Sequence, residues 1–288
     1  MILVTGAAGQ VGTDVFAELN KRGISHSGID IIEKENISVV DITDQKAVLA
    51  FLTKKKPKCV IHCAAYTAVD KAEDEPELCR KINIEGTENI AIACKETGAE
   101  MICLSTDYVF DGKGDTPYET DAPKIPISVY GKSKSEGEEA VLKHLDKYYI
   151  VRISGVFGIY GSNFVKTMLN LSQTRNELNV VDDQIGSRTY TVDLAVLLCD
   201  MALSGKYGVY HATNEGFCSW AEFAAEIMKQ SGTSCNINPV SSEQYPTKAE
   251  RPKNFRLSKA CLDRAGFDRL PHWQDALERY IKQERKEI

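Results

Sequence analysis

Two residues of the segment YGKSK, Tyr130 and Lys134, have the spacing that acid–base chemistry requires. They are four residues apart at the start of a predicted helix, so their side chains project from one face. A tyrosine with an ordinary pKa of ~10 is a weak acid at neutral pH, and a neighbouring ammonium stabilises the phenolate and lowers that pKa. The pair predicts a general acid with its activating cation. Because this spacing is common on helices, the pair alone leaves a surface coincidence open.

A hydroxyl partner upstream favours the chemical interpretation. Ser105, Thr106 and Asp107 follow an apolar segment that predicts a strand. Ligands of parallel sheets bind beyond the carboxyl ends of the strands. We therefore expect Thr106 to hold a substrate carbonyl while Tyr130 protonates it.

Three glycines in VTGAAGQVG, Gly6, Gly9 and Gly12, follow one predicted strand and open a helix. This arrangement gives a tight turn and a close backbone approach to a pyrophosphate, with the positive end of a helix dipole aimed at it. Asp30 ends the next strand, where a carboxylate accepts hydrogen bonds from ribose hydroxyls and repels a 2′-phosphate. The segment predicts NADH or NADPH as cofactor, with NADH favoured by Asp30.

The elements that must position these residues predict an α/β fold, a Rossmann-type doubly wound parallel sheet. Short β-branched runs alternate with helical patterns over residues 1–154, as in stacked βαβ units. Strands are predicted at 2–5, 25–30, 59–65, 100–105 and 149–153. Helices are predicted after the glycine turn and at 77–97 and 131–145, the first of these two ending at Gly98.

After Gly155 the pattern becomes less regular, with longer connections. Helices are predicted at 163–175, 192–204, 220–230 and 273–285, and strands at 178–181 and 208–212. We expect a smaller, interleaved C-terminal substrate domain made of residues 155–186 and 214–288, with 187–213 returning to the dinucleotide-binding domain of residues 1–154.

Composition narrows the classes of protein. Hydrophobic residues make up 43% and charged residues 26% of the 288 residues, the balance of a globular chain. The net charge is −6 and basic residues are spread out, so no nucleic acid is expected as partner. The longest apolar stretch, AVLLCDMAL, is too short to span a bilayer, so no membrane partner is expected.

The nine cysteines are scattered and mostly lie in apolar segments, without a CxxC pair. They predict reduced thiols in a cytoplasmic protein, and no secretory signal is recognisable at the N-terminus. In the segment KCVIHCAAY, His62 and its two neighbouring cysteines are interpreted as core residues rather than metal ligands. No metal site is predicted.

Several segments together resemble the dTDP-4-dehydrorhamnose reductase family of extended short-chain dehydrogenases/reductases: GAAGQVG, CAAYTAVDKAE, NIEGTENI, STDYVFDG, YGKSKSEGE, NFVKTML and VVDDQIGS. The resemblance implies hydride transfer from NAD(P)H to the keto carbon of dTDP-4-dehydro-L-rhamnose, giving dTDP-L-rhamnose for surface polysaccharide. It implies catalysis by Thr106, Tyr130 and Lys134. It leaves open whether the protein is a monomer or a homodimer.

The resemblance also implies two sets of binding residues. The dinucleotide would contact Gly6, Gly9, Gln10, Val11, Gly12, Asp30, Asp41, Ile42, Ala64, Ala65, Tyr66, Tyr130 and Lys134, with Asn83 supporting the active-site lysine through water. The nucleotide sugar would contact Val69, Thr106, Asp107, Tyr108, Gly155, Asn163, Arg188 and Arg251.

The chain departs from the family pattern at two positions. Gly155 stands where a tryptophan is usual, and Arg188 where a proline is usual. Losing an aromatic platform of ~0.5–1.5 kcal/mol would reshape sugar binding. Some family members use Mg²⁺ held by carboxylates near the first helix; Asp14 stands there and is interpreted as a solvated residue.

The sequence leaves three alternatives to this function open. The protein could reduce another nucleotide 4-keto sugar. It could be a nucleotide-sugar epimerase or dehydratase, although the dehydratases carry a glutamate where this chain has Tyr108. It could also be a non-catalytic dinucleotide-binding regulatory subunit, against which the set of Thr106, Tyr130 and Lys134 argues.

Overall fold

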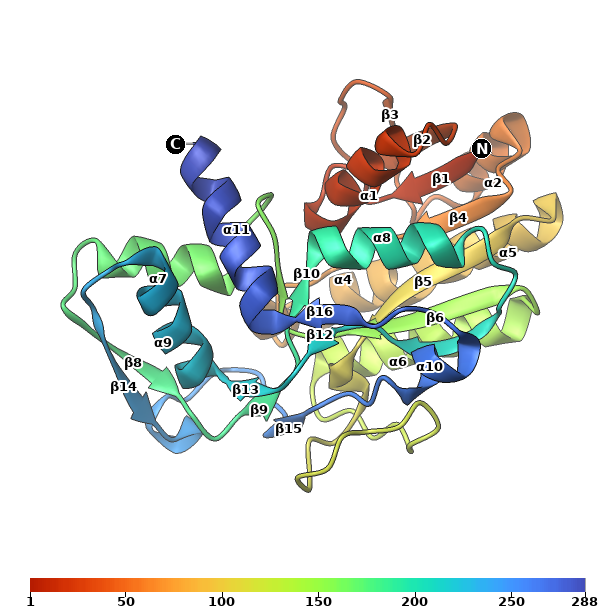
Figure 1. The fold of residues 1–288 in the computed structure, drawn as a ribbon. Helices are drawn as coiled ribbons and strands as arrows, with labels where there is room; N and C mark the ends of the chain where they lie inside the picture. The colour runs from red at the N-terminus through yellow and green to blue at the C-terminus, as the bar shows by residue number, and fades with distance from the viewer. Residues whose placement is uncertain (288) are drawn as a thin grey trace.

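The computed structural model describes residues 1–287 and is built around one large parallel sheet (Figure 1). Its seven strands lie in the order β11-β6-β5-β4-β1-β2-β3, and every neighbouring pair is parallel. The strands are β1 (Ile2–Thr5), β2 (His26–Asp30), β3 (Ile37–Val39), β4 (Cys59–His62), β5 (Glu100–Thr106), β6 (Tyr148–Ile153) and β11 (Gly208–His211). This is the predicted doubly wound α/β fold, with the order reversing between β1 and β4.

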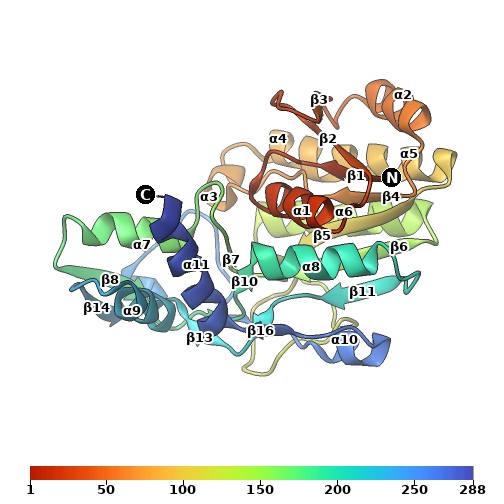
Figure 2. The ribbon, with the colours of Figure 1, turned by 45° about the horizontal axis from the view of Figure 1, so that its top comes forward.

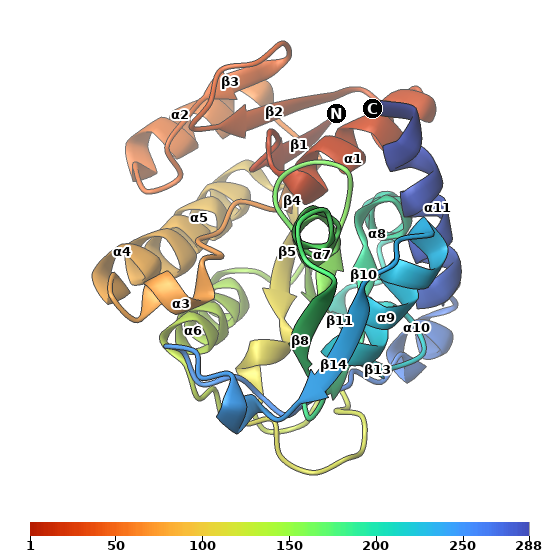
Figure 3. The same ribbon diagram turned by 90° about the vertical axis from the view of Figure 1, so that its left-hand side faces the viewer.

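The central strands are mostly apolar because helices cover both faces of the sheet. β1 and β4 are buried at every position. Figures 2 and 3 show α1 (Gln10–Lys21) and α8 (Thr191–Met201) on one face, and α2 (Gln45–Lys55), α5 (Thr87–Thr97) and α6 (Val129–His144) on the other. On α1, Val15 and Leu19 are fully buried four residues apart, as the spacing predicts.

The helix predicted over 77–97 is interrupted. It comprises α4 (Pro76–Arg80), a π-helical segment at Lys81–Gly86, and α5, which ends at Gly98 with a φ of 71°. Inside the π segment Asn83 is buried and hydrogen-bonds both backbone groups of Tyr66. The backbone of Gly86 lies against Ile42, where an added Cβ would come within 2.7 Å. The prediction of a helix over this segment is therefore confirmed, and its middle widens into a π-helical turn where it contacts distant segments.

A second group of elements lies to the left of the sheet in Figure 1, beyond the carboxyl ends of its strands. Its helices are α7 (Phe164–Ser172), α9 (Trp220–Ser231) and α11 (Trp273–Glu287), and β8 (Glu177–Val181) pairs with β14 (Asn236–Val240). Short strands link it to the sheet: β7 (Val156–Phe157), β9 (Ile185–Gly186), β10 (Thr189–Tyr190), β12 (Asn214–Glu215), β13 (Cys218–Ser219), β15 (Asn254–Phe255) and β16 (Leu270–His272). The remaining helices, α3 (Val69–Ala72) and α10 (Ala260–Ala265), are short.

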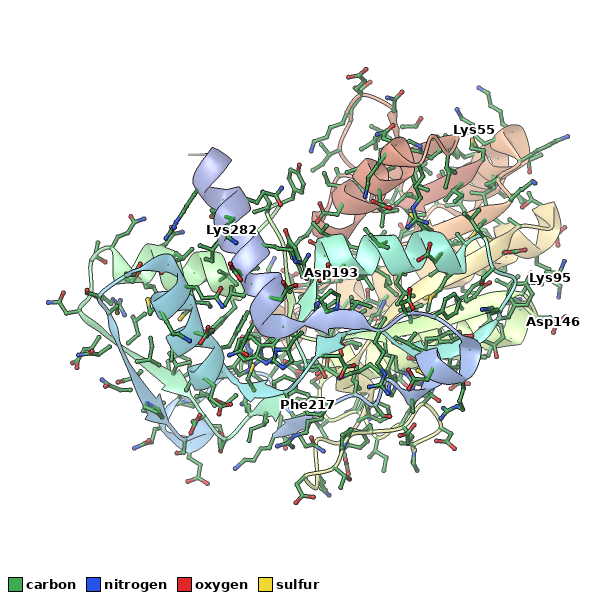
Figure 4. The ribbon with its side chains drawn as sticks, in the orientation of Figure 1. Lys55, Lys95, Asp146, Asp193, Phe217 and Lys282 are labelled. Carbon is green, nitrogen blue, oxygen red and sulfur yellow. The ribbon has the colours of Figure 1, made fainter. Side chains whose placement is uncertain are left out.

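An ion pair joins the two groups of elements. Asp193, at the start of α8, lies beside the base of α11 (Figure 4) and accepts hydrogen bonds from both terminal nitrogens of Arg279 at 2.7 Å. The Asn214 amide also donates to Asp193 at 2.7 Å.

Within residues 1–287, every helix is too short or too polar to cross a membrane.

Two buried histidines are expected to make the stability of the protein depend on pH. His62 lies between the hydroxyls of Thr5 and Thr87, and burial lowers its pKa to about 3. Burial likewise lowers the pKa of His211 to about 3. Since an unfolded histidine has a pKa near 6.5, the unfolded chain binds more protons between pH 6.5 and pH 3.

We therefore expect the free energy of unfolding to fall as the pH drops below 6.5, by ~1.4 kcal/mol per pH unit for each histidine. Urea unfolding of the wild type and His62→Gln between pH 7.5 and 4.5 measures this. The variant should be less stable at pH 7.5 but have the shallower pH dependence. Equal slopes for the two proteins would contradict the assignment.

Candidate active site

The glycine turn between β1 and α1 has no room for side chains at two positions. Gly6 has a φ of +61°, and a Cβ on it would lie 2.6 Å from the Ala64 backbone nitrogen. A Cβ on Gly12 would lie 2.2 Å from the Gly6 carbonyl oxygen. Gly9 is the N-cap residue of α1. The turn therefore brings bare backbone and a helix N-terminus to one edge of the sheet, which is a cradle for a pyrophosphate.

Asp30 is fixed against this turn at the end of β2. One carboxylate oxygen accepts a hydrogen bond from the Ala8 amide at 2.9 Å, and the other accepts one from the Ile31 amide at 2.7 Å. The carboxylate is thus held in place beside the turn, as a ribose-binding acid requires.

Thr106 and Asp107 lie where β5 ends. The Thr106 hydroxyl donates to the Asp107 carboxylate at 3.1 Å and accepts from the Tyr108 amide at 3.2 Å. Both residues are at least 95% buried. Burial raises the pKa of the Asp107 carboxyl to about 7, although the Thr106 hydrogen bond and the charge of Arg188 both act to lower it.

Tyr130 and Lys134 extend from the first turns of α6. The hydroxyl of Ser128 caps this helix by accepting from the Gly131 amide at 3.1 Å. The Lys134 ammonium is buried and donates to the Leu104 carbonyl at 2.8 Å. The Tyr130 ring meets Tyr108 edge to face at 5.5 Å.

The direction of the Tyr130 pKa differs from the sequence-based expectation. Burial raises the pKa of Tyr130, and a hydrogen bond with the Thr106 side chain lowers it only in part. The predicted lowering of the Tyr130 pKa is not seen, because burial outweighs the contacts that lower it. The hydrogen bond does bring the Thr106 and Tyr130 side chains together, as predicted.

These features share one cavity of about 790 Å³. Most of the predicted binding and catalytic residues line it: Gly6, Gly9, Gln10, Val11, Gly12, Asp30, Asp41, Ile42, Ala64, Ala65, Val69, Thr106, Asp107, Tyr108, Tyr130, Lys134 and Gly155. The cavity runs from the glycine turn to the end of β5, so it can hold an extended dinucleotide with a second ligand beside Tyr130.

Five predicted site residues lie outside the lining of this cavity. The Tyr66 hydroxyl donates to Glu75 at 2.9 Å, and the Asn83 amide donates to Ser133 at 2.9 Å. Asn163 caps α7 and donates to Gln10 at 3.3 Å. Arg251 pairs with Asp70 at 2.6 Å, and Arg188 is buried behind Gly155. The structure therefore places these five residues next to the cavity lining rather than in it.

Sequence reasoning missed several lining residues. Ile31 and Ile32 line the cavity although they are 74% and 55% exposed. Two exposed isoleucines directly after a strand end were a usable signal. Thr43, Cys63, Lys81 and Ser162 also line it. No local pattern marks these four, because tertiary packing alone brings them to the site.

Two further expectations concern possible metal ligands. Asp14 is 6% exposed on α1, so its interpretation as a solvated residue was wrong. His62 and Cys59 are buried in the core, as predicted, whereas Cys63 is half-buried on the cavity wall. Among the described residues, no cluster of three or more His, Cys, Asp or Glu side chains is placed to hold a metal ion.

A doubly wound sheet with a glycine turn, and with a Tyr–Lys helix beside a threonine at a strand end, defines an oxidoreductase of the short-chain dehydrogenase/reductase type. A family model described as "RmlD substrate binding domain" matches residues 1–286. The chain therefore belongs to this family.

Relatives of known name agree with this membership. The chain is 41% identical to the spore coat polysaccharide biosynthesis protein SpsK of Bacillus subtilis, over 98% of this chain and 97% of the relative. It is 40% identical to dTDP-4-dehydrorhamnose reductase of Streptomyces griseus, over 96% and 91%. The structure of dTDP-4-dehydrorhamnose reductase from Bacillus anthracis in complex with NADP matches with a TM-score of 0.93 and 40% identity, over 98% of both chains.

Proposed function

We propose that this protein reduces the 4-keto group of dTDP-4-dehydro-L-rhamnose with NADH or NADPH, giving dTDP-L-rhamnose for surface polysaccharide. The observation that carries the proposal is the meeting of Thr106, Tyr130 and Lys134 in one cavity with the glycine turn. The identity of the sugar substrate is inferred from the names of the relatives.

The reduced dinucleotide supplies the hydride when it is bound along the cradle of Gly6, Gly9 and Gly12. Thr106 hydrogen-bonds the keto oxygen of the sugar, and Tyr130 gives that oxygen its phenolic proton as C4 gains the hydride. Lys134 provides the positive charge that stabilises the resulting phenolate. Solvent then returns the proton to Tyr130, so the reaction consumes one dinucleotide and one proton.

The surrounding residues take binding roles in this proposal. Residues 1–154 with 187–213 form the dinucleotide domain, and residues 155–186 with 214–288 form the substrate domain. Val69, Asp107, Tyr108 and Gly155 face the sugar, since all four line the cavity.

All nine cysteines are free thiols, which supports a cytoplasmic location. The protein acts as a monomer or a homodimer.

The test is to follow NADH and NADPH oxidation by absorbance with dTDP-4-dehydrorhamnose generated in situ. We expect turnover that consumes the dinucleotide in equal amount to the sugar. Purification with tightly bound, non-exchanging NAD and no net oxidation would instead indicate an epimerase or dehydratase. Dinucleotide binding without turnover of any keto sugar would indicate a regulatory subunit.

The cofactor preference gives a second test of the site. Asp30 places a carboxylate beside the turn, which would repel the 2′-phosphate of NADPH. We propose a preference for NADH and expect Asp30→Asn to raise the ratio of kcat/KM with NADPH to that with NADH about tenfold or more, or ~1.4 kcal/mol. Asp44→Asn is the matched control, because Asp44 caps α2 outside the cavity lining. An unchanged ratio in Asp30→Asn would refute this role.

A further inference from the structure

Arg188 is a fully buried cation that forms no salt bridge among the described residues. It lies between β9 and β10 and is 0% exposed. Its guanidinium carbon lies 4.0 Å from the Trp220 ring centroid, 5.0 Å from that of Phe255 and 5.2 Å from that of Phe223. Among the ion pairs of the described residues, none includes Arg188. Burying a charge without a counterion costs free energy of folding, so a functional role could explain why Arg188 is kept at this position.

The hydrogen-bond acceptors of Arg188 are neutral backbone carbonyls, so they do not compensate its positive charge. One terminal nitrogen donates to the Ser187 carbonyl at 3.0 Å and the other to the Cys218 carbonyl at 3.2 Å. Its Nε is buried with no hydrogen-bond partner among the described residues. Carbonyl dipoles and aromatic rings do not neutralise a cation, so the charge of Arg188 can act on acidic side chains nearby.

Gly155 lies between Arg188 and the cavity. A Cβ on Gly155 would lie 3.0 Å from Arg188 Cδ, 3.3 Å from Arg188 Nη1 and 2.8 Å from the Ser187 carbonyl oxygen. Gly155 itself lines the cavity and has a φ of +53°. No side chain can therefore stand at this point, and the guanidinium lies directly behind the cavity wall.

The acid near Arg188 is Asp107. It lines the same cavity as Gly155, and the pairing of Thr106 with Ile153 places Asp107 beside Ser154, the residue before Gly155. The groups around Asp107 are the hydroxyl of Thr106, the side chain of Ser154, the phenols of Tyr108 and Tyr130, and Arg188. Beyond Tyr108 lie Arg251 and Asp70. Arg188 in turn is influenced by Cys218 and Glu222. The positive charge of Arg188 acts to lower the pKa of Asp107.

We propose that Arg188 is a positioning residue for the sugar: its buried charge, acting past Gly155, holds Asp107 as a carboxylate that accepts hydrogen bonds from sugar hydroxyls. This inference rests on the proposed function for its sugar ligand. Arg188 touches neither substrate nor cofactor, so it acts only through the charge of Asp107.

The charge of Asp107 can be measured directly. Protein labelled with ¹³C in the aspartate carboxyl groups is titrated by NMR, with Asp107→Asn identifying the signal. Removing the nearby positive charge in Arg188→Met should raise the pH at which Asp107 titrates by about one unit or more. Arg188→Lys, which keeps the charge, should move it less. Methionine suits the aromatic cage, so Arg188→Met should fold, and Arg269→Met, outside the cavity, is the matched control.

The pH profile of kcat/KM with the keto sugar provides the second readout. We expect its acidic limb in Arg188→Met to move upward with the Asp107 titration, and the control to match the wild type. An unchanged Asp107 titration in a folded Arg188→Met variant would overturn the proposal, as would a shifted titration with an unshifted acidic limb. If the wild type reduces no keto sugar, the proposed function fails, while the NMR titration still decides whether Arg188 controls Asp107.

Discussion

Tyr130→Phe is expected to lower kcat/KM for keto-sugar reduction by ~10²–10⁴-fold, because it removes the proton that neutralises the forming alkoxide. The phenylalanine ring keeps the shape of the cavity wall and the edge-to-face contact with Tyr108. The proposed function assigns dinucleotide binding to the glycine turn and Asp30, so the dissociation constant of the dinucleotide should stay within a few-fold of the wild-type value. Single-turnover absorbance and cofactor fluorescence titration measure the two quantities.

The matched control for this experiment is Tyr118→Phe. Tyr118 also has a hydrogen-bonded hydroxyl, which donates to Asp111 at 2.7 Å, and its ring stacks on Phe110 outside the cavity lining. Its loss should leave kcat/KM nearly unchanged. Normal turnover by Tyr130→Phe would remove Tyr130 from the mechanism, and loss of dinucleotide binding would show that the substitution had damaged the cavity instead.

Six strands of the central sheet could be predicted from the sequence because they obey a simple local rule, whereas the three-residue edge strand β3 was not predicted. β1 and β5 are β-branched or apolar runs buried on both faces, and their predicted bounds agree with the structure to within a residue. The short strands of the second group, such as β7 and β10, were not predicted. A strand of two residues has no period of its own, and tertiary packing alone determines its pairing.

The candidate site could likewise be predicted only in part. The glycines of the turn and the Tyr130–Lys134 pair lie within single local segments, so spacing was enough to find them. Arg188 was predicted to contact the sugar, yet it is buried in an aromatic cage. Arginine side chains are mostly exposed, and only the assembled fold shows that Gly155 leaves space for this one.

The largest effect on stability is expected at Glu138, a buried carboxylate on α6. It is 1% exposed and accepts hydrogen bonds from Arg152 Nε at 2.9 Å and Nη2 at 2.8 Å. The hydroxyl of Ser105 donates to it at 2.5 Å, and the ammonium of Lys124 lies 3.2 Å away. Burial acts to raise the pKa of Glu138, but Arg152 and Lys124 hold it below the usual value. The carboxylate thus ties α6, which carries Tyr130, to β5, which ends in Thr106.

Glu138→Gln keeps the shape of this side chain but leaves the buried charge of Arg152 uncompensated. We expect it to lower the free energy of unfolding by ~3–5 kcal/mol, measured by urea unfolding. Its neighbour Glu139 is 61% exposed and pairs with Lys124 at the surface, so Glu139→Gln should cost less than about 1 kcal/mol. Removing both buried charges, in Glu138→Gln with Arg152→Met, should recover part of the loss because no unpaired charge then remains buried. Equal stabilities for Glu138→Gln and Glu139→Gln would mean that the buried pair does not hold α6 against the sheet.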